Sequence, residues 1–424
     1  MRKVLTLTTA FSAFLLSTSA MAAGFHLREQ SAAAQGNAFS GATAGAEDNS
    51  YTYYNVAGLT RQKGTQVTLG GTYIAPKATA KNVRGENGER DADVENVVHA
   101  AVSPNFTVSH QINDKWFIGI AGNSPFGMIT KYDHGWVGGD HGITSDVKTA
   151  TVTPMTAYKA TDKLSLGAGL QIQYLWAHLT SSHSASRTGI VSEDGHSWAA
   201  GYQLGALYEF TERTRFGVGY RSEIKHKIKG KMKSSGSELP YPYGAGIDSM
   251  LNQDIKVDLD TPAMLSFGLY HDITDRWAVM AEYQRVFWSS FKDLTFKSRN
   301  GNNRLGYNYV ASVNENWRDT NFYAIGTSFM LDEQWKLRLG LAYDQSAVTL
   351  KHRTPRIPDS DRFWMTVGLG YKYNEHLDFN MAYTYINARK AHLDTSLTGN
   401  DGYNVKADYH NSIQAFAFGL SYKF

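Results

Sequence analysis

The chain contains no cysteine among its 424 residues. This absence excludes disulfides, thiol catalysis and thiolate metal ligands. An excess of one charge is missing as well: 42 Lys and Arg face 39 Asp and Glu, and the net charge of +3 gives no indication of nucleic-acid binding. Long hydrophobic runs are also lacking. After residue 22, no segment approaches the ~18 uninterrupted apolar residues that predict a spanning helix, and the mean hydropathy is −0.38.

Catalytic and cofactor-binding motifs are absent too. The sequence has no G-x-S-x-G, H-E-x-x-H or Walker pattern, and its Gly-x-Gly pairs fall in predicted strands rather than at the start of a helix. Asp133-His134 and Asp140-His141 repeat in one loop and could bind a cation, but their spacing and glycine-rich setting give little support for a metal site. We therefore expect a protein that is not an enzyme and that holds neither metal nor cofactor.

Aromatic residues and glycine are abundant, with 13% aromatics, 25 Tyr and 39 Gly. This composition fits a membrane β-barrel, in which the hydropathies of lipid-facing and lumen-facing residues average to a polar value along each strand. It also fits a large soluble β protein. The final strand favours the barrel. Its small or charged face consists of Ala415, Ala417, Gly419, Ser421 and Lys423. Its other face is a lipophilic row of Phe416, Phe418, Leu420, Tyr422 and Phe424.

The N-terminus predicts export. Arg2 and Lys3 precede an apolar run from residue 4 to 16, and Ala20-Met21-Ala22 is an A-x-A cleavage pattern. We predict that residues 1–22 are a cleaved Sec signal peptide rather than a membrane anchor, because the run is too short to span a bilayer. The expected location is the bacterial outer membrane, with a mature chain of 424 − 22 = 402 residues.

A short pattern recurs along the chain: an apolar strand end, two or three polar turn residues, and a new strand. The six instances lie at 112–116, 160–164, 210–214, 273–277, 331–335 and 373–377. Such tight turns join hairpin strands and lie on the periplasmic side of an outer-membrane barrel. Trp116, Trp277 and Trp335 would then belong to the inner aromatic girdle. Six such turns, with a first rising and a last descending strand, imply fourteen strands.

The predicted fold is therefore all-β: a transmembrane antiparallel barrel of about fourteen strands over residues 63–424. The expected strands are 65–78, 97–112, 115–132, 146–160, 163–180, 197–211, 213–232, 253–273, 275–298, 317–331, 334–350, 361–374, 376–391 and 408–424. The long polar loops expected outside the cell are 79–96, 181–196, 233–252, 299–316 and 392–407.

Residues 23–62 do not alternate and are rich in Ala, Gly and Ser. Composition alone leaves two interpretations, a compact plug inside the lumen or a disordered periplasmic tail. Two motifs bear on the choice. The first runs through Phe25, Leu27, Glu29, Ser31, Gly36, Ala38, Ser40, Gly41, Glu47, Asp48, Asn55, Ala57, Gly58 and Leu59. The second is I-P-D-S-D-R-F-W at 357–364.

Together these motifs resemble the long-chain fatty-acid transporter family of Gram-negative outer membranes, the FadL type, over essentially the whole mature chain. The resemblance implies a fourteen-stranded barrel plugged by an N-terminal hatch over 23–62, with hatch positions Phe25, Glu29, Asn55 and Ala57. One departure is Val56, where the family pattern has proline. Proline fixes φ and lacks an N–H, so the stiffness of this hatch turn is in question.

The resemblance also implies the function. The family imports long-chain fatty acids without energy coupling, through an extracellular apolar groove, a lumenal pocket and a sideways exit at a kinked third strand. Expected partners are the fatty acids, outer-membrane lipid and lipopolysaccharide, and the barrel-assembly machinery, since the terminal Phe resembles a sorting signal. The chain is expected to be a monomer. Import of aromatic hydrocarbons, or a surface adhesin or phage-receptor role, are the alternatives.

The third strand is interrupted by Ser124, Pro125, Phe126 and Gly127. Proline cannot donate to a β-ladder, and glycine inside a strand marks a bend or bulge. With the resemblance, this segment is predicted to be the kink of the lateral gate. The alternative is a bulge without a role in transport.

Two candidate ligand sites follow. The long loop 233–252 contains an apolar set that could form the capture groove or merely pack the loop: Leu239, Tyr241, Tyr243, Ile247, Met250 and Leu251. A buried carboxylate needs a basic partner, and Arg318 stands where the family has a pocket lysine. It could instead pair with Asp319. The resemblance implies a second pocket cation, at a position near Ser181. That cation is missing from this chain, and only His178 or His183 could substitute for it.

Overall fold

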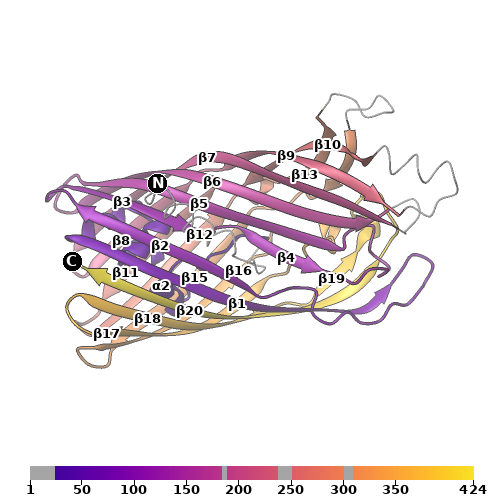
Figure 1. Ribbon diagram of the computed structural model, residues 1–424. Coiled ribbons are helices and arrows are strands. Elements are labelled where there is room, and N and C mark those ends of the chain that lie inside the picture. Colours follow the sequence, from indigo (N-terminus) through magenta and orange to yellow (C-terminus); the bar gives the residue numbers. More distant parts are fainter. Residues whose placement is uncertain (1–23, 184–188, 237–250, 300–308) are drawn as a thin grey trace.

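The computed structural model describes residues 24–183, 189–236, 251–299 and 309–424. Its fold is a closed antiparallel barrel of 14 strands with a small helical segment at the N-terminus (Figure 1). The predicted fold class and strand number are confirmed. Several wall strands are interrupted, so the wall consists of β1 (Thr65–Arg84), β2 (Ala101–Gln111), β3 (Trp116–Asn123) with β4 (Gly127–Lys131), β5 (Thr144–Lys159), β6 (Leu164–Ser182), β7 (Ile190–Thr211), β8 (Thr214–Arg221) with β9 (Ile224–Ser235), β10 (Gln253–Thr261) with β11 (Met264–Asp272), β12 (Trp277–Val286) with β13 (Asp293–Ser298), β14 (Tyr309–Asn314) with β15 (Thr320–Met330), β16 (Trp335–Asp344), β17 (Arg362–Lys372), β18 (Leu377–Ala388) with β19 (Ala391–Asp394), and β20 (Lys406–Lys423).

The barrel closes between its first and last strands. Leu69 of β1 lies opposite both a β2 residue and Leu420 of β20, in antiparallel register. The two faces of β20 are those that its alternation predicts: Phe416 is 50% exposed, whereas Ala417 beside it is 6% exposed. Lipid outside and a filled lumen inside explain this difference.

The strand limits differ from the prediction where the wall rises toward the long loops. The sixth strand begins at Ile190 rather than 197, and β14 lies inside the predicted loop 299–316. The predicted strand 253–273 is divided at Pro262, which cannot donate to the ladder. Alternation is weaker in these regions because both faces carry polar groups there, so the periodicity underestimates strand length.

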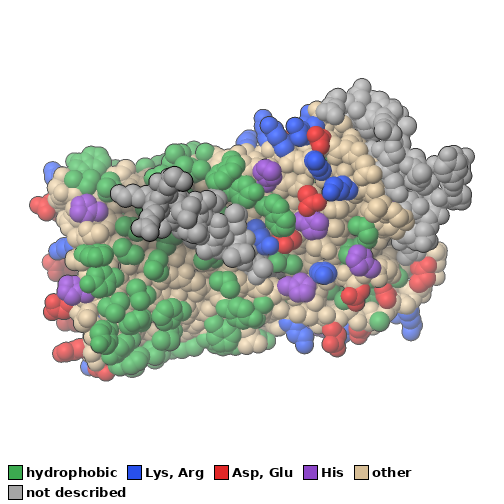
Figure 2. All heavy atoms as spheres, in the orientation of Figure 1, with side chains coloured by type: hydrophobic (Ala, Val, Ile, Leu, Met, Phe, Trp, Pro, Cys, Tyr) green, Lys and Arg blue, Asp and Glu red, His purple; other side chains and the backbone are tan. Residues whose placement is uncertain are grey.

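The two ends of the barrel are distinguishable. Short turns lie at one end, next to Trp116 and Trp277, which are 46% and 43% exposed. Short turns mark the periplasmic end of such barrels, and the long loops therefore lie outside the cell. Exposed apolar side chains form a band over the wall next to this end, and charged residues lie at its rim and again over the other half of the barrel (Figure 2). Among the described residues, no helix has the length and apolarity needed to cross a bilayer.

Residues 24–62, here called the plug, lie against the inner side of the wall. They form α2 (Ala32–Gly36), α3 (Ala42–Gly45), η1 (Asn49–Tyr53) and η2 (Val56–Arg61), and α2 is seen between the strands in Figure 1. Nearly every plug residue is buried. Ser31 caps α2 by accepting a hydrogen bond from Ala34 N, and Asn55 caps η2 in the same way. The predicted signal peptide, residues 1–22, lies outside the described residues.

Candidate functional site

A small apolar cavity lies in the extracellular half of the barrel, directly above the plug. Its free volume is about 50 Å³. Pockets that enclose a drug-sized ligand measure roughly 300–1,000 Å³, so a long acyl chain fits only if the lining moves. The aliphatic and aromatic lining comes from six wall strands, from the segment before β13 and from the plug: Phe25, Met128, Val147, Ala177, Leu179, Ile228, Ile255, Val257, Leu259, Phe291, Leu294 and Phe296.

Three charged side chains face this cavity. Arg356 lies in the connection between β16 and β17 and interacts electrostatically with Glu193 and Glu315. All three residues line the cavity. Nη1 of Arg356 donates to Thr144 O at 2.9 Å and to Ser145 Oγ at 3.0 Å. The cavity therefore offers one cation, held in place by the wall, near two carboxylates. A ligand carboxylate would compete with these two acids for Arg356.

A second, more polar cavity of about 240 Å³, here called the vestibule, continues from the first toward the long loops. Leu179, Glu193, Phe296 and Arg356 line both. The rest of its lining includes hydroxyl and amide groups as well as Leu251. A ligand coming from the cell surface would pass polar groups first and apolar groups second.

The floor of the cavity is an aromatic cluster around Phe25 of the plug. The ring of Phe25 packs edge-on against Trp288 at 4.9 Å and Trp317 at 5.8 Å between centroids, and it also meets Phe126 at 5.8 Å. The preceding Gly24 N donates to Asp359 Oδ2 at 3.0 Å. The I-P-D-S-D-R-F-W motif thus fixes the beginning of the plug below the cavity.

The wall has a gap beside this floor. Strands β2 and β3 pair up to Phe106 and Gly122, and the wall closes again at the bridge between Val98 and Thr130. Between these two points, within the described part of the chain, β2 pairs only with β1. The gap lies beside the segment 124–126, where the third strand is interrupted between Asn123 and Gly127. Pro125 of this segment cannot donate to a β-ladder.

The plug fills the inner side of this gap. Leu27 N donates to Pro125 O at 2.8 Å, Gly127 N donates to Phe25 O at 2.8 Å, and His26 forms an antiparallel bridge with Phe126. The Gln30 amide donates to Ser124 O at 2.9 Å. Backbone groups that would otherwise face lipid without partners are satisfied in this way.

The structure places Arg318 away from the cavity. Its side chain is 53% exposed and contacts Asp361 at 3.5 Å, while Asp319 pairs with Arg285 instead. Residues 315–319 lie between β14 and β15, outside any strand, and the segment buries Trp317, which is 3% exposed, while it turns Arg318 outward. Arg356, which the sequence analysis did not consider, is the guanidinium that lines the cavity. Its position directly before the I-P-D-S-D-R-F-W motif is the signal that could have indicated it.

The predicted loop residues are placed only in part. Leu239, Tyr241, Tyr243, Ile247 and Met250 lie outside the described residues, and Leu251 lines the vestibule. His178 points to the outside and contacts Asp194 at 2.6 Å. Ser181 and His183 line the vestibule, where His183 Nε2 lies 2.7 Å from Ser234 Oγ. Asp140 and His141 bind the backbone of Tyr403 and so connect two loops.

The remaining predicted hatch residues have structural partners. Asn55 donates to Thr43 O at 2.7 Å and to Ala206 O at 2.9 Å, which ties the plug to β7. Ala57 is fully buried, and Val56 packs in a small apolar cluster that includes Leu59. The turn at Val56 is therefore tightly packed with valine in this position.

A buried ionic contact holds the lower part of the plug. Glu47 lies 2.7 Å from Arg338 and 3.2 Å from Lys336, both on β16. Burial acts to raise the pKa of Glu47, but the two cations outweigh it and hold the pKa well below its usual range. The plug is thus anchored at its top by Asp359 and at its bottom by Arg338.

Comparison with known proteins agrees with this geometry. A family model described as outer membrane protein transport protein (OMPP1/FadL/TodX) matches residues 13–424. The chain is 27% identical over 442 residues to the long-chain fatty acid transport protein of Salmonella typhi, covering 98% of this chain and 97% of the relative. It is 26% identical to outer membrane protein P1 of Haemophilus influenzae, covering 97% of each.

Two solved structures share the fold. A Pseudomonas aeruginosa FadL homologue matches with a TM-score of 0.85 at 24% identity, covering 95% of this chain and 100% of that one. The Pseudomonas putida toluene transporter TodX matches with a TM-score of 0.70 at 19% identity, covering 94% and 99%.

Proposed function

Because the chain belongs to the outer membrane transport family described as OMPP1/FadL/TodX, we propose that it carries long-chain fatty acids across the outer membrane by passive diffusion. The relative in Salmonella typhi, named a long-chain fatty acid transport protein, supports this substrate class. The ligand enters through the vestibule, its chain occupies the apolar cavity, and its carboxylate binds Arg356. It leaves sideways through the gap between β2 and the β3–β4 kink.

One observation carries the proposal: a single segment, residues 24–30, closes two openings. Phe25 is the floor of the cavity, and the backbone of residues 25–27 is bonded to the edge of the gap at 125–127. Because the cavity is smaller than an acyl chain, the ligand must displace part of its lining. Displacement of Phe25 enlarges the cavity and frees the gap in one movement.

A second candidate substrate class is neutral, such as aromatic hydrocarbons. The observation that favours it is the position of Arg356 near Glu193 and Glu315, which leaves no unopposed cation among the described groups lining the cavity. A neutral ligand needs no basic partner, because only apolar surface is buried. The name of the Pseudomonas putida toluene transporter is consistent with this class.

The two classes separate in an uptake experiment. Cells that lack their own outer-membrane fatty-acid transporter are supplied with the chain, and labelled oleate and labelled toluene uptake are measured at equal surface expression. Arg356→Gln is expected to lower oleate uptake roughly tenfold, as loss of a charged hydrogen-bond partner implies, and to spare toluene. The matched control Arg318→Gln is expected to change neither, because that side chain lies outside. No oleate uptake by the folded wild-type barrel would reject the fatty-acid proposal.

A further inference from the structure

A row of basic side chains crosses the outer face of the wall at the level of the outer leaflet. The β-registers place Lys148 opposite Trp176, Trp176 opposite His196, and His196 opposite Lys229. Lys229 in turn stands opposite Lys256, and Lys256 stands opposite Lys297. It therefore runs over six adjacent strand segments, β5, β6, β7, β9, β10 and β13, which corresponds to about 24 Å at ~4.8 Å per strand. We call the basic residues of this row, that is all of them except Trp176, the cationic row.

The row is unusual because like charges stand directly opposite each other. Lys256 has Lys229 on one side and Lys297 on the other. Like charges in cross-strand pairs destabilise a sheet unless an opposite charge lies close. Among the described residues, no ion pair or hydrogen bond is made by the ammonium groups of these three lysines. Lys148 differs, since it contacts Asp146 at 2.9 Å.

The neighbouring rows are different. One position further outward, the signs alternate across the strands, with Lys231 between Asp194 and Asp254. One position further inward, Lys227 stands opposite Asp258. Lys227 and Lys231 of β9 thus stand directly opposite carboxylates, whereas the direct cross-strand neighbours of Lys256 are two further lysines. The carboxylates nearest to Lys256, Asp254 and Asp258, lie two residues away along β10. An anion from outside the protein would offset the repulsion between the three facing lysines of this row.

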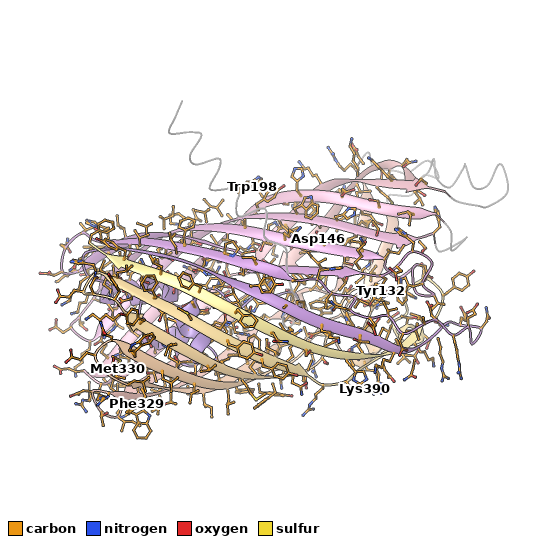
Figure 3. The ribbon with its side chains drawn as sticks, turned by 60° about the horizontal axis from the view of Figure 1, so that its bottom comes forward. Tyr132, Asp146, Trp198, Phe329, Met330 and Lys390 are labelled. Atoms are coloured by element: carbon orange, nitrogen blue, oxygen red, sulfur yellow. The ribbon has the colours of Figure 1, made fainter. Side chains whose placement is uncertain are left out.

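At β7, the depth of the row fits the phosphate layer of the membrane, and because the strands tilt by ~40°, each further strand shifts this depth by only ~3 Å. On β7, the exposed Phe210 and Trp198 lie twelve positions apart. At ~3.3 Å per residue and a tilt of ~40°, this separation is about 30 Å along the membrane normal, close to the ~25 Å apolar band of such barrels. Trp198, which is labelled on the outside of the wall in Figure 3, therefore marks the outer interface. His196 is the next outward-facing residue beyond it.

We propose that the cationic row binds the phosphate groups of lipopolysaccharide in the outer leaflet, with Lys229, Lys256 and Lys297 as the principal contacts. Lysine ammonium groups at the membrane surface attract anionic headgroups, and charge-assisted hydrogen bonds to phosphate are strong. Figure 2 shows Lys and Arg side chains gathered over β9 and β10 beyond the apolar part of the wall. This surface is separate from the cavity and does not depend on the transported substrate.

The test compares two triple variants with equal loss of charge. Purified full-length barrels are titrated in nanodiscs with diphosphorylated lipid A and with the same lipid after removal of its phosphates. Lys229→Gln/Lys256→Gln/Lys297→Gln is expected to weaken lipid A binding by tenfold or more, since each basic group near the surface contributes. Lys225→Gln/Lys227→Gln/Lys231→Gln, whose lysines face Asp residues, is expected to weaken it by less than about threefold. Dephosphorylated lipid is expected to bind the wild type as weakly as the row variant binds lipid A.

Equal weakening in the two variants, or equal binding of the dephosphorylated lipid, would overturn the proposal. Folding of each variant is checked by its heat-modifiable mobility on gels. If the row triple does not fold, the single change Lys256→Gln replaces it, with an expected loss of about threefold against Lys227→Gln as its control. Wild-type affinity in Lys256→Gln would then reject the proposal.

Discussion

At the scale of single residues, Glu29 makes the plug sensitive to pH. Its carboxyl group is buried, and Oε2 has no hydrogen-bond partner among the described residues. Burial raises the pKa of Glu29 to about 7, although Arg28 and Arg362 act to lower it. In a displaced plug the pKa would return to ~4.3. Because the seated plug favours the protonated acid, this stabilisation is complete below about pH 4.3 and is lost as the pH rises toward 7.

The corresponding prediction concerns channel opening. In planar bilayers, the wild type is expected to show more frequent transient openings at pH 8 than at pH 5, since ionised Glu29 disfavours the seated plug. Glu29→Gln is expected to remove most of this difference. The free energy by which protonation of Glu29 favours the seated plug is at most ~3 kcal/mol for a pKa change of this size. Glu375→Gln, in an exposed periplasmic turn, is the control and should behave as the wild type. An unchanged pH dependence in Glu29→Gln would show that other groups control the plug.

At the scale of elements, strand glycines allow the plug and the wall to approach closely. A Cβ at Gly217 of β8 would lie 2.0 Å from Thr43 O, and one at Gly340 of β16 would lie 2.1 Å from Asn37 C. Both neighbours are plug backbone, which cannot move without moving the plug. These glycines are thus required for contact rather than for turn geometry.

Gly217→Ala is therefore expected to loosen the plug while leaving the barrel folded. The added methyl group overpacks the contact with α3, at a cost of ~1–3 kcal/mol. Small-ion conductance should rise, with little change in heat-modifiable mobility on gels. Gly71→Ala is the matched control, since its Cβ would meet nothing closer than Ser103 O at 3.6 Å. Equal conductance in the two variants would contradict the role of Gly217.

The wall was predictable from sequence to a much greater extent than the site. Lipid and lumen impose opposite demands on alternate residues, so the faces of β20 and the number of strands follow from periodicity. The kink at Pro125 follows from the missing N–H. Arg356 could not be found in this way, because a loop folded over the lumen has no periodicity to indicate where a side chain points. The resemblance predicts Arg318 in the pocket, but this residue lies in the irregular segment between β14 and β15, where its side chain is 53% exposed.

The strand glycines illustrate the same limit. Gly217 and Gly219 are visible in the sequence, and a strand interior is an unfavourable place for glycine. The sequence does not contain the reason, which is the backbone of Thr43 and Tyr54 against the wall. Contacts between segments far apart in the chain, such as plug and barrel, depend on the three-dimensional path of both.

At the scale of the whole molecule, the seated plug makes the cavity and the lateral gap mutually dependent. Phe25 belongs to the cavity, and Leu27 is bonded to the kink at Pro125, although only one residue separates them in the chain. Movement of one without the other would break the backbone pairing of this short segment. We therefore expect the ligand cavity and the exit to open together, so that the barrel stays closed to small ions until the hydrophobic ligand displaces the plug.

A reversible cross-link tests this coupling directly, and the absence of native cysteine makes it specific. His26 and Phe126 form an antiparallel bridge that is flanked by the hydrogen bonds of Leu27 N and Gly127 N. Such non-hydrogen-bonded pairs have Cα atoms ~4.5 Å apart, within the range that a disulfide spans. Oxidised His26→Cys/Phe126→Cys is expected to lose oleate uptake by at least tenfold, because the plug can no longer leave the kink, and a reductant should restore it.

Each single-cysteine variant controls for the loss of its side chain and should respond to neither oxidant nor reductant. Full uptake by the oxidised double variant, with the cross-link verified by mass spectrometry, would exclude exit at the kink. The ligand would then have to pass downward to the periplasm, where Glu47 and Arg338 close the path. In that case Glu47→Gln, rather than the cross-link, would change the rate of uptake, so the two variants together distinguish a sideways exit from an axial one.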